Sequence, residues 1–241
     1  MSDQNLLVKY VPNFVTLLSL SSGFTSIRFS FIGEWKIAIY LILLATIFDF
    51  FDGWFARKLK SDSNFGAELD SLSDFVSFGV APSILIYLWS TNTLGSLGWG
   101  ATLFFVICSS LRLARFTADI YITNKPIDNK EYFVGIPSPA ASGLILLPLF
   151  IFFEYDLNFL KNQYLNFFST IVIGFMMISK IPTISLKKIY INPKYKTWIF
   201  LIFVFFSVSL VSKIWLTLTI LFGIYLLSII YTIIKSRKVK R

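Results

Sequence analysis

Apolar segments long enough to cross a membrane fill most of this 241-residue chain, and they limit the folds open to it. A membrane-spanning helix needs roughly 20 apolar residues, because each residue adds about 1.5 Å along the axis. Hydrophobic residues make up 56% of the chain, and its mean hydropathy is +0.71. We therefore expect an all-α, polytopic integral membrane helical bundle that forms a single domain over residues 1–241. Eight spans are predicted, at residues 12–32, 35–59, 69–91, 96–118, 136–154, 163–180, 197–212 and 214–235.

Lysine and arginine indicate the orientation of these spans, because flanking positive charge is retained on the cytoplasmic side. One set of flanks carries 18 of the 22 basic residues, and the other carries only Arg28, Lys36, Lys161 and Lys213. We therefore expect both termini to face the cytoplasm, with the basic tail at residues 236–241 lying against anionic headgroups. The first ten residues lack the pattern of a cleaved signal, so we expect the first apolar segment to stay in the protein.

The composition also excludes several classes of site. The chain has no histidine, which rules out histidine-metal sites and nucleophiles activated by histidine. Its one cysteine, Cys108, allows neither an internal disulfide nor a thiolate zinc cluster. The net charge of +9 does not indicate nucleic acid, because the basic residues flank apolar spans and form no nucleic-acid module. We therefore expect any catalytic base to be a carboxylate.

Four aspartates, Asp49, Asp52, Asp70 and Asp74, lie in or beside two of the apolar segments. Carboxylates are costly in a bilayer and usually face a cavity, pair with cations or carry chemistry. Spacings of i, i+3 and i, i+4 place each pair on one face of its helix, so two antiparallel helices can oppose them. Asp49 lies about 12 Å along the helix from the cytoplasmic Arg57. Four oxygen donors suit one or two Mg²⁺ or Mn²⁺ ions. The alternative is that the acids only form ion pairs that join two helices.

Eight residue identities at fixed spacing make this region specific: Asp49, Asp52, Gly53, Ala56, Arg57, Gly66, Asp70 and Asp74. This core signature, residues 49–74, resembles that of the CDP-alcohol phosphotransferases. The resemblance implies that the first three aspartates bind divalent metal. It also implies that Asp74, beside the same metal site, deprotonates an attacking alcohol. The released group would be CMP, by direct displacement or through an aspartyl-phosphate, of which we favour the first.

The resemblance also implies a pocket for the CDP group, formed by Gly53, Ala56, Arg57 and Gly66. A Pro-Asn-x-x-Thr pattern near the N-terminus adds Asn13 and Thr16 to this pocket. The pattern has a second interpretation, because Asn13 behind Pro12 is also typical of a helix N-cap.

Three later segments, at residues 109–116, 135–141 and 179–183, resemble the phosphatidylserine synthase branch of that family. This resemblance implies CDP-diacylglycerol and L-serine as substrates, and homodimers are common in the family. The acceptor alcohol or a substrate phosphate would contact Arg112, Arg115, Ser138 and Lys180. The guanidinium group of arginine suits both carboxylate and phosphate. Snorkelling at a helix end is the alternative role for the arginines. Glycerol 3-phosphate and inositol or inositol phosphate stay open as other acceptors.

A function of another class, divalent-cation transport, is also compatible with buried carboxylates. Transport predicts acids at the membrane midplane that are reachable from both faces, whereas these acids cluster near one face. Metal uptake into sealed vesicles without a CDP-lipid would favour transport.

Overall fold

The computed structural model describes residues 3–59, 63–123, 132–179, 182–184 and 196–239, and within them helices dominate. This confirms the predicted all-helical membrane bundle. The elements in chain order are α1 (Asp3–Ile32), α2 (Trp35–Leu59), α3 (Asn64–Asp74), η1 (Phe75–Val80), α4 (Ala81–Trp89), η2 (Thr91–Leu94), α5 (Ser96–Thr123), β1 (Tyr132–Val134), α6 (Ser138–Tyr155), η4 (Asn158–Lys161), α7 (Gln163–Ile178), β2 (Pro182–Ile184), α8 (Lys196–Ser212) and α9 (Ile214–Val239).

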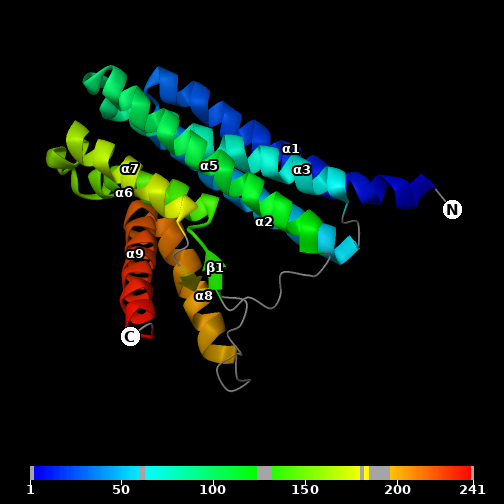
Figure 1. Ribbon diagram of the computed structural model, residues 1–241. Helices are drawn as coiled ribbons and strands as arrows, with labels where there is room; N and C mark the ends of the chain where they lie inside the picture. The colour runs from blue at the N-terminus through cyan, green and yellow to red at the C-terminus, as the bar shows by residue number, and fades with distance from the viewer. Residues whose placement is uncertain (1–2, 60–62, 124–131, 180–181, 185–195, 240–241) are drawn as a thin grey trace.

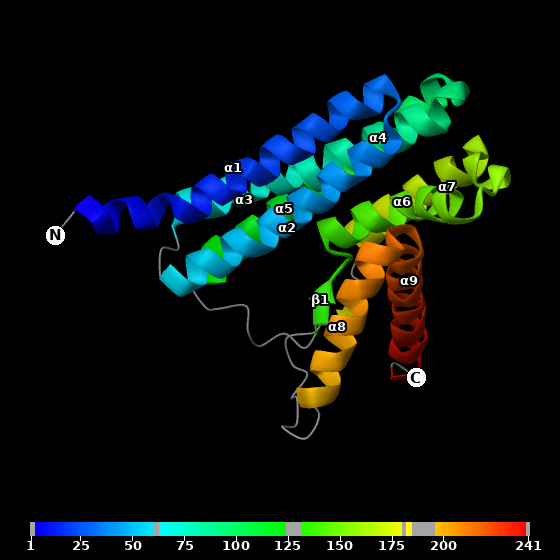
Figure 2. The same ribbon diagram turned by 180° about the vertical axis from the view of Figure 1, so that it is seen from behind.

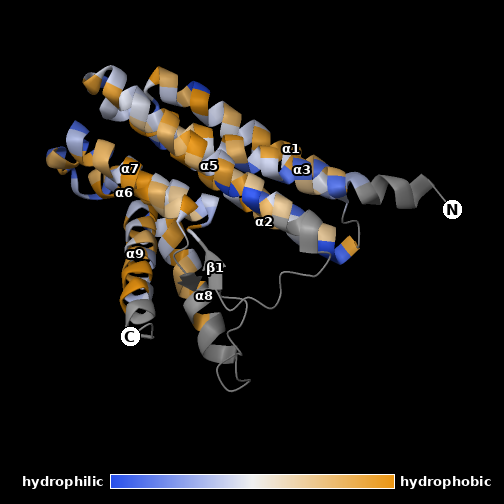
Figure 3. Cartoon of the chain, viewed as in Figure 1, coloured by the Kyte–Doolittle hydropathy of each residue, from blue (hydrophilic) through white to orange (hydrophobic). Residues whose placement is uncertain are grey.

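Six of the described helical segments are long and apolar enough to cross a membrane: Tyr10–Ile32, Trp35–Leu59, Asn64–Trp89, Ser96–Ala118, Ser138–Tyr155 and Ile214–Ile234. The helix Gln163–Ile178 is apolar but shorter. Figure 3 shows hydrophobic colour along most of the helices. Large apolar side chains such as Phe205, Val211 and Leu227 point outward, as expected of surfaces that contact lipid.

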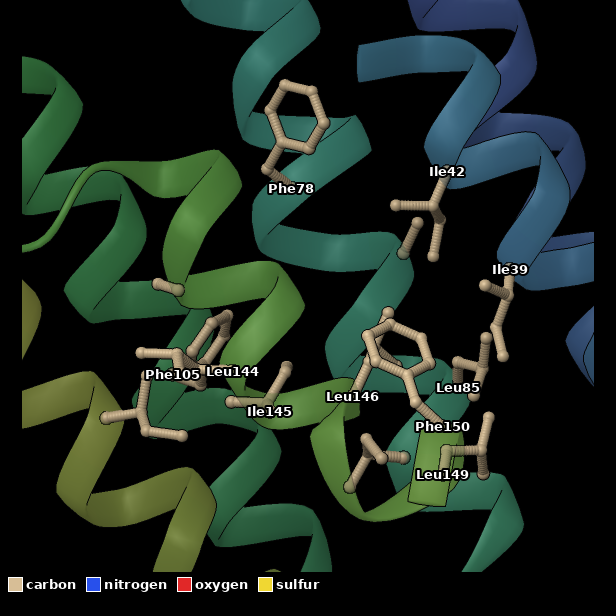
Figure 4. Packing of buried hydrophobic residues seen from close by; sticks show 14 of the residues in the cluster. Ile39, Ile42, Phe78, Leu85, Phe105, Leu144, Ile145, Leu146, Leu149 and Phe150 are labelled. Atoms are coloured by element: carbon tan, nitrogen blue, oxygen red, sulfur yellow. The ribbon is translucent and has the colours of Figure 1, made fainter. Parts of the chain in front are cut away.

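The helices form two groups (Figures 1 and 2). Helices α1 to α5 run alongside one another as a long sloping layer, and α6 and α7 lie next to this layer. Helices α8 and α9 leave the bundle at an angle, and α9 packs against α6. The helices break at Lys213, which confirms the predicted division between the last two. The apolar core lies between α2, α4, α5 and α6, where Figure 4 shows Ile39, Leu85, Phe105 and Phe150 among the packed side chains.

Buried serines hold α1 against its neighbours. The Ser19 hydroxyl donates to the carbonyl of Ala45 on α2 at 3.0 Å, and the Ser26 hydroxyl donates to that of Ala38 at 2.9 Å. From the other side, Ser77 of η1 donates to the carbonyl of Ser19 at 3.2 Å. A Cβ added to Gly23 would lie 2.6 Å from the Cα of Ser77. Small residues therefore let the backbones of α1, α2 and η1 approach closely, as is usual between membrane helices.

The N-terminal helix differs from its predicted start. The predicted first span at residues 12–32 agrees with the candidate span Tyr10–Ile32, but helix α1 itself begins at Asp3 and contains Pro12. The N-cap interpretation of Asn13 is therefore wrong. A proline removes only one intrahelical hydrogen bond and does not prevent the residues upstream from being helical. Nearby, the Thr16 hydroxyl donates to the Pro12 carbonyl at 3.0 Å.

The third span begins earlier than predicted and contains a π-helical segment. Ser63 caps α3 by accepting a hydrogen bond from the Gly66 amide at 3.0 Å, so the helix starts five residues before the predicted Leu69. The π segment η1 follows Asp74 directly and continues into α4. Such π segments are frequent at functional sites because they change the helical register locally.

A short antiparallel sheet joins two segments that are distant in sequence. Strand β1 pairs with β2, with Tyr132 opposite Ile184 and Val134 opposite Pro182. The sequence did not indicate these strands, because each is only three residues long. The pairing holds the chain before α6 against the chain after α7.

Candidate active site

Helices α2 and α3 bring three of the four aspartates together. One carboxylate oxygen from each of Asp49, Asp70 and Asp74 lies within 4.8 Å of the other two. Asp49 and Asp74 are close enough to share a hydrogen bond. Three carboxylates at this separation repel one another unless protons or a cation neutralise them. Their oxygens therefore form a fitting set of ligands for a hard divalent cation.

The fourth aspartate, Asp52, lies beside this cluster and faces a pocket. It is buried near Asp49 and Asp70, and its Oδ2 atom has no hydrogen-bond partner. The Oδ1 atom of Asp74 is also buried without a partner. Unpaired buried carboxylate oxygens are costly, so both positions favour a ligand that supplies a positive charge or a donor.

The pocket adjoining the cluster lies between α1, α2 and α3 and has a volume of about 330 Å³. It brings together all six residues predicted to bind the CDP group. The lining consists of Pro12, Asn13, Thr16, Asp52, Gly53, Ala56, Arg57, Ser63, Gly66, Ala67 and Asp70. Three of these, Pro12, Ser63 and Ala67, were not predicted as site residues. Of them, Ser63 carried a usable signal, because a serine three residues before Gly66 is typical of a helix N-cap.

Two helical glycines keep this pocket open. A Cβ added to Gly66 would lie 3.2 Å from Asn13 Oδ1 and 3.2 Å from Ser63 Oγ. A Cβ added to Gly53 would lie 3.3 Å from the Nη1 atom of Arg57. Side chains at either position would therefore crowd the polar groups that line the pocket.

The two arginines of α5 have different surroundings. Arg112 Nη1 donates to the hydroxyl of Ser138, the fully buried first residue of α6, at 2.9 Å, and the guanidinium lies near Asp74. Arg115 is exposed, and its Nη1 donates at 3.5 Å to the carbonyl of Ile178, the last residue of α7. A cation there stabilises the C-terminus of a helix. The structure thus places Arg112 near Asp74 and bonded to Ser138, whereas Arg115 contacts the end of α7. Lys180 lies outside the described residues.

A further residue near the arginine, Tyr225, was not predicted. It lies on α9, close enough to Arg112 for the two groups to interact. The sequence contains no signal for it, because Tyr225 is one of many aromatic residues in apolar spans.

Gly135 sets the turn that leads into α6 and its Ser138. Its φ is +82°, and a Cβ at this position would collide with the carbonyl oxygen of Met177 and lie 3.1 Å from that of Ser179. We predict that Gly135→Ala destabilises the fold by about 1–3 kcal/mol, through left-handed strain and the collision.

Thermal melting in detergent checks this prediction, with Gly100→Ala as the matched control. A Cβ on Gly100, inside α5, would meet nothing within 4 Å. The control should melt at the wild-type temperature or slightly above it. An unchanged melting temperature for Gly135→Ala would contradict the role of this turn.

Comparison with known families agrees with the geometry of the site. The profile of the CDP-alcohol phosphatidyltransferase family matches residues 9–238. The chain belongs to this family. The family match extends over α1 to α9, so the carboxylate cluster and the adjoining pocket both lie inside the family's domain.

Several curated proteins that bear the name CDP-diacylglycerol–serine O-phosphatidyltransferase are similar to the chain, among them the following three. It is 32% identical to that of Mycobacterium leprae over 230 residues, which cover 95% of this chain and 76% of the relative. The protein of Helicobacter pylori strain 26695 is 33% identical over 93% of this chain and 90% of its own length. That of Methanocaldococcus jannaschii is 36% identical over 83% of this chain and 81% of its own length.

Proposed function

We propose that this protein transfers the phosphatidyl group from CDP-diacylglycerol to L-serine, which forms phosphatidylserine and releases CMP. The observation that carries this proposal is the contact between two features: a cluster of three carboxylates and a pocket of about 330 Å³ that contains the family's nucleotide-binding pattern. The names of the relatives support serine as the acceptor.

We propose that Asp49, Asp70 and Asp74 hold a divalent cation, Mg²⁺ or Mn²⁺, with Asp52 at the edge of the site toward the pocket. When bound, such an ion neutralises charge on the phosphates during phosphoryl transfer. The donor set supports this assignment, because it consists of oxygen atoms alone.

The pocket residues orient the donor lipid. Arg57 supplies a positive charge beside Gly53, where the backbone is accessible because no side chain covers it. Asn13 and Thr16 add polar groups from α1. A ligand held between α1, α2 and α3 would thus place its pyrophosphate toward the carboxylates. Fixing the reacting groups in this way lowers the entropic part of the barrier.

Asp74 is the proposed base. Its carboxylate accepts the proton of the serine hydroxyl, whose oxygen forms a bond to the β-phosphorus as the bond from that phosphorus to the CMP oxygen breaks. Arg112, near Asp74, offers a guanidinium to the acceptor's carboxylate. Direct displacement requires only these groups, so we favour it over a covalent aspartyl-phosphate.

We also propose that all eight predicted spans cross the cytoplasmic membrane, with both termini and the active site at the cytoplasmic face. The asymmetry of Lys and Arg supports this orientation. The site would then be reachable by soluble serine from the cytosol and by the lipid from the inner leaflet. A homodimer stays a prediction.

An assay of CMP release with different acceptors tests the proposed function. With CDP-diacylglycerol and Mn²⁺, we expect release to depend on L-serine and to stay near background with glycerol 3-phosphate, inositol or inositol phosphate. A phosphorylated acceptor should need more cationic contacts than Arg112 provides. Release with glycerol 3-phosphate but not with serine would overturn the choice of acceptor.

A further inference from the structure

A phenol and a guanidinium nitrogen near the proposed base region are both buried without a hydrogen-bond partner within the described residues. The two atoms are Oη of Tyr225 and Nε of Arg112. The two side chains are close enough to interact, although they come from α9 and α5. Burying a polar hydrogen without an acceptor is unfavourable, and such groups in a folded protein call for an explanation.

Arg112 has two further interactions among the described residues. Its Nη1 atom donates to Ser138 Oγ at 2.9 Å, and the guanidinium interacts electrostatically with Asp74. The Nε–H of Arg112 can only donate, and the O–H of Tyr225 can donate as well as accept, so both groups can offer a hydrogen to one ligand. Two donors that lie near one another fit a ligand that presents acceptor atoms and a negative charge, which a carboxylate does.

We infer that Tyr225 and Arg112 together bind the carboxylate of the amino-acid acceptor, and that the Tyr225 hydroxyl is a determinant of acceptor affinity. This inference rests on the proposed function, because it requires a carboxylate-bearing acceptor. It also explains how the acceptor is oriented. A carboxylate held on Arg112 places the rest of a small amino acid near Asp74, which takes the proton of its hydroxyl.

Arg112 and Arg115 therefore have different roles. Arg115 is exposed and donates to the end of α7, so it contributes to packing rather than to the acceptor. The structure therefore assigns acceptor recognition to Arg112 of α5 and Tyr225 of α9.

The test is the kinetics of Tyr225→Phe, which removes the hydroxyl and keeps the ring. We expect KM for L-serine to rise about 10- to 100-fold, as for the loss of a hydrogen bond to a charged group. The kcat at saturating serine and KM for CDP-diacylglycerol should stay near their wild-type values. The matched control is Tyr231→Phe, because Tyr231 lies on the same helix but is exposed, and it should leave all three constants unchanged.

A second measurement separates binding from folding. The melting temperature of Tyr225→Phe without substrates should equal or exceed that of the wild type, because the hydroxyl has no partner to lose. A clearly lower melting temperature would show that the hydroxyl has a structural role, and it would overturn the inference.

Inhibition by L-alanine identifies the group that Tyr225 contacts. Alanine has the carboxylate and ammonium of serine but no hydroxyl, so its inhibition constant against serine should rise by the same factor as KM. If Tyr225→Phe left either the inhibition constant of alanine or the KM for serine unchanged, the inference would be overturned. The proposed function would still be supported by the reaction of the wild-type protein with serine. If the wild-type protein did not use serine at all, both would fail.

Discussion

Replacing Asp74 by asparagine is expected to lower the rate of phosphatidylserine synthesis by about 10²–10⁴-fold, the usual contribution of a general base. The amide has nearly the same shape as the carboxyl group but cannot accept a proton. The buried Oδ1 atom of Asp74 has no hydrogen-bond partner within the described residues, and the asparagine amide can still donate to Asp49, so little structural support is lost. The variant should therefore fold and melt like the wild type.

The measurement for Asp74→Asn combines CMP release with Mn²⁺ affinity. Asparagine keeps a carbonyl oxygen, which also coordinates hard cations, so metal affinity should fall far less than activity. Glu68→Gln is the matched control, because Glu68 lies on the same helix, is exposed and does not line the pocket. Near-normal turnover by Asp74→Asn would remove Asp74 as the base.

Removal of a carboxylate ligand should abolish activity through loss of the metal. We expect Asp49→Ala and Asp70→Ala each to reduce synthesis by about 10²–10⁴-fold, since a catalytic cation supplies several kcal/mol of stabilisation in the transition state. Both variants leave only two of the three clustered carboxylates. They also reduce the repulsion within the cluster, so their stability without metal should not fall.

Titration with Mn²⁺ and treatment with a chelator check the metal prediction. Both variants should bind Mn²⁺ weakly, and excess Mn²⁺ should restore activity only in part. Glu34→Ala is the control, because Glu34 is exposed in the short turn between α1 and α2. Full wild-type activity in the chelator would refute a metal mechanism altogether.

The local parts of the site followed well from the sequence. The spacings of Asp49 with Asp52 and of Asp70 with Asp74 require only that each segment be helical, and the apolar composition makes helices obligatory in a bilayer. The six predicted nucleotide-binding residues lie on three helices, so they line one pocket only because α1, α2 and α3 pack together, and the family resemblance rather than local periodicity indicated them. The ends of the helices did not follow from the sequence, as the start of α1 shows. The length of an apolar segment does not determine how far the polar residues beside it continue the helix.

Contacts between distant segments were beyond the sequence pattern. The pairing of β1 with β2 depends on how α6 and α7 place the chain on either side of them. The three-carboxylate cluster, with Asp52 beside it, depends on the packing of α2 against the helices around it. In the same way, Arg112 and Arg115 look equivalent on one helical face, and only the positions of Ser138 and Ile178 distinguish them.

The sequence by itself determined that the chain forms membrane helices, and it indicated the acids and glycines that the structure places at the cluster and the pocket. Hydrophobic length and helical periodicity are properties of neighbouring residues, so a single segment is enough to reveal them. The tertiary structure decided which carboxylates converge, which arginine faces them, and that Tyr225 joins that arginine. Those choices depend on how the side chains of separate helices pack together, and no local pattern encodes this packing.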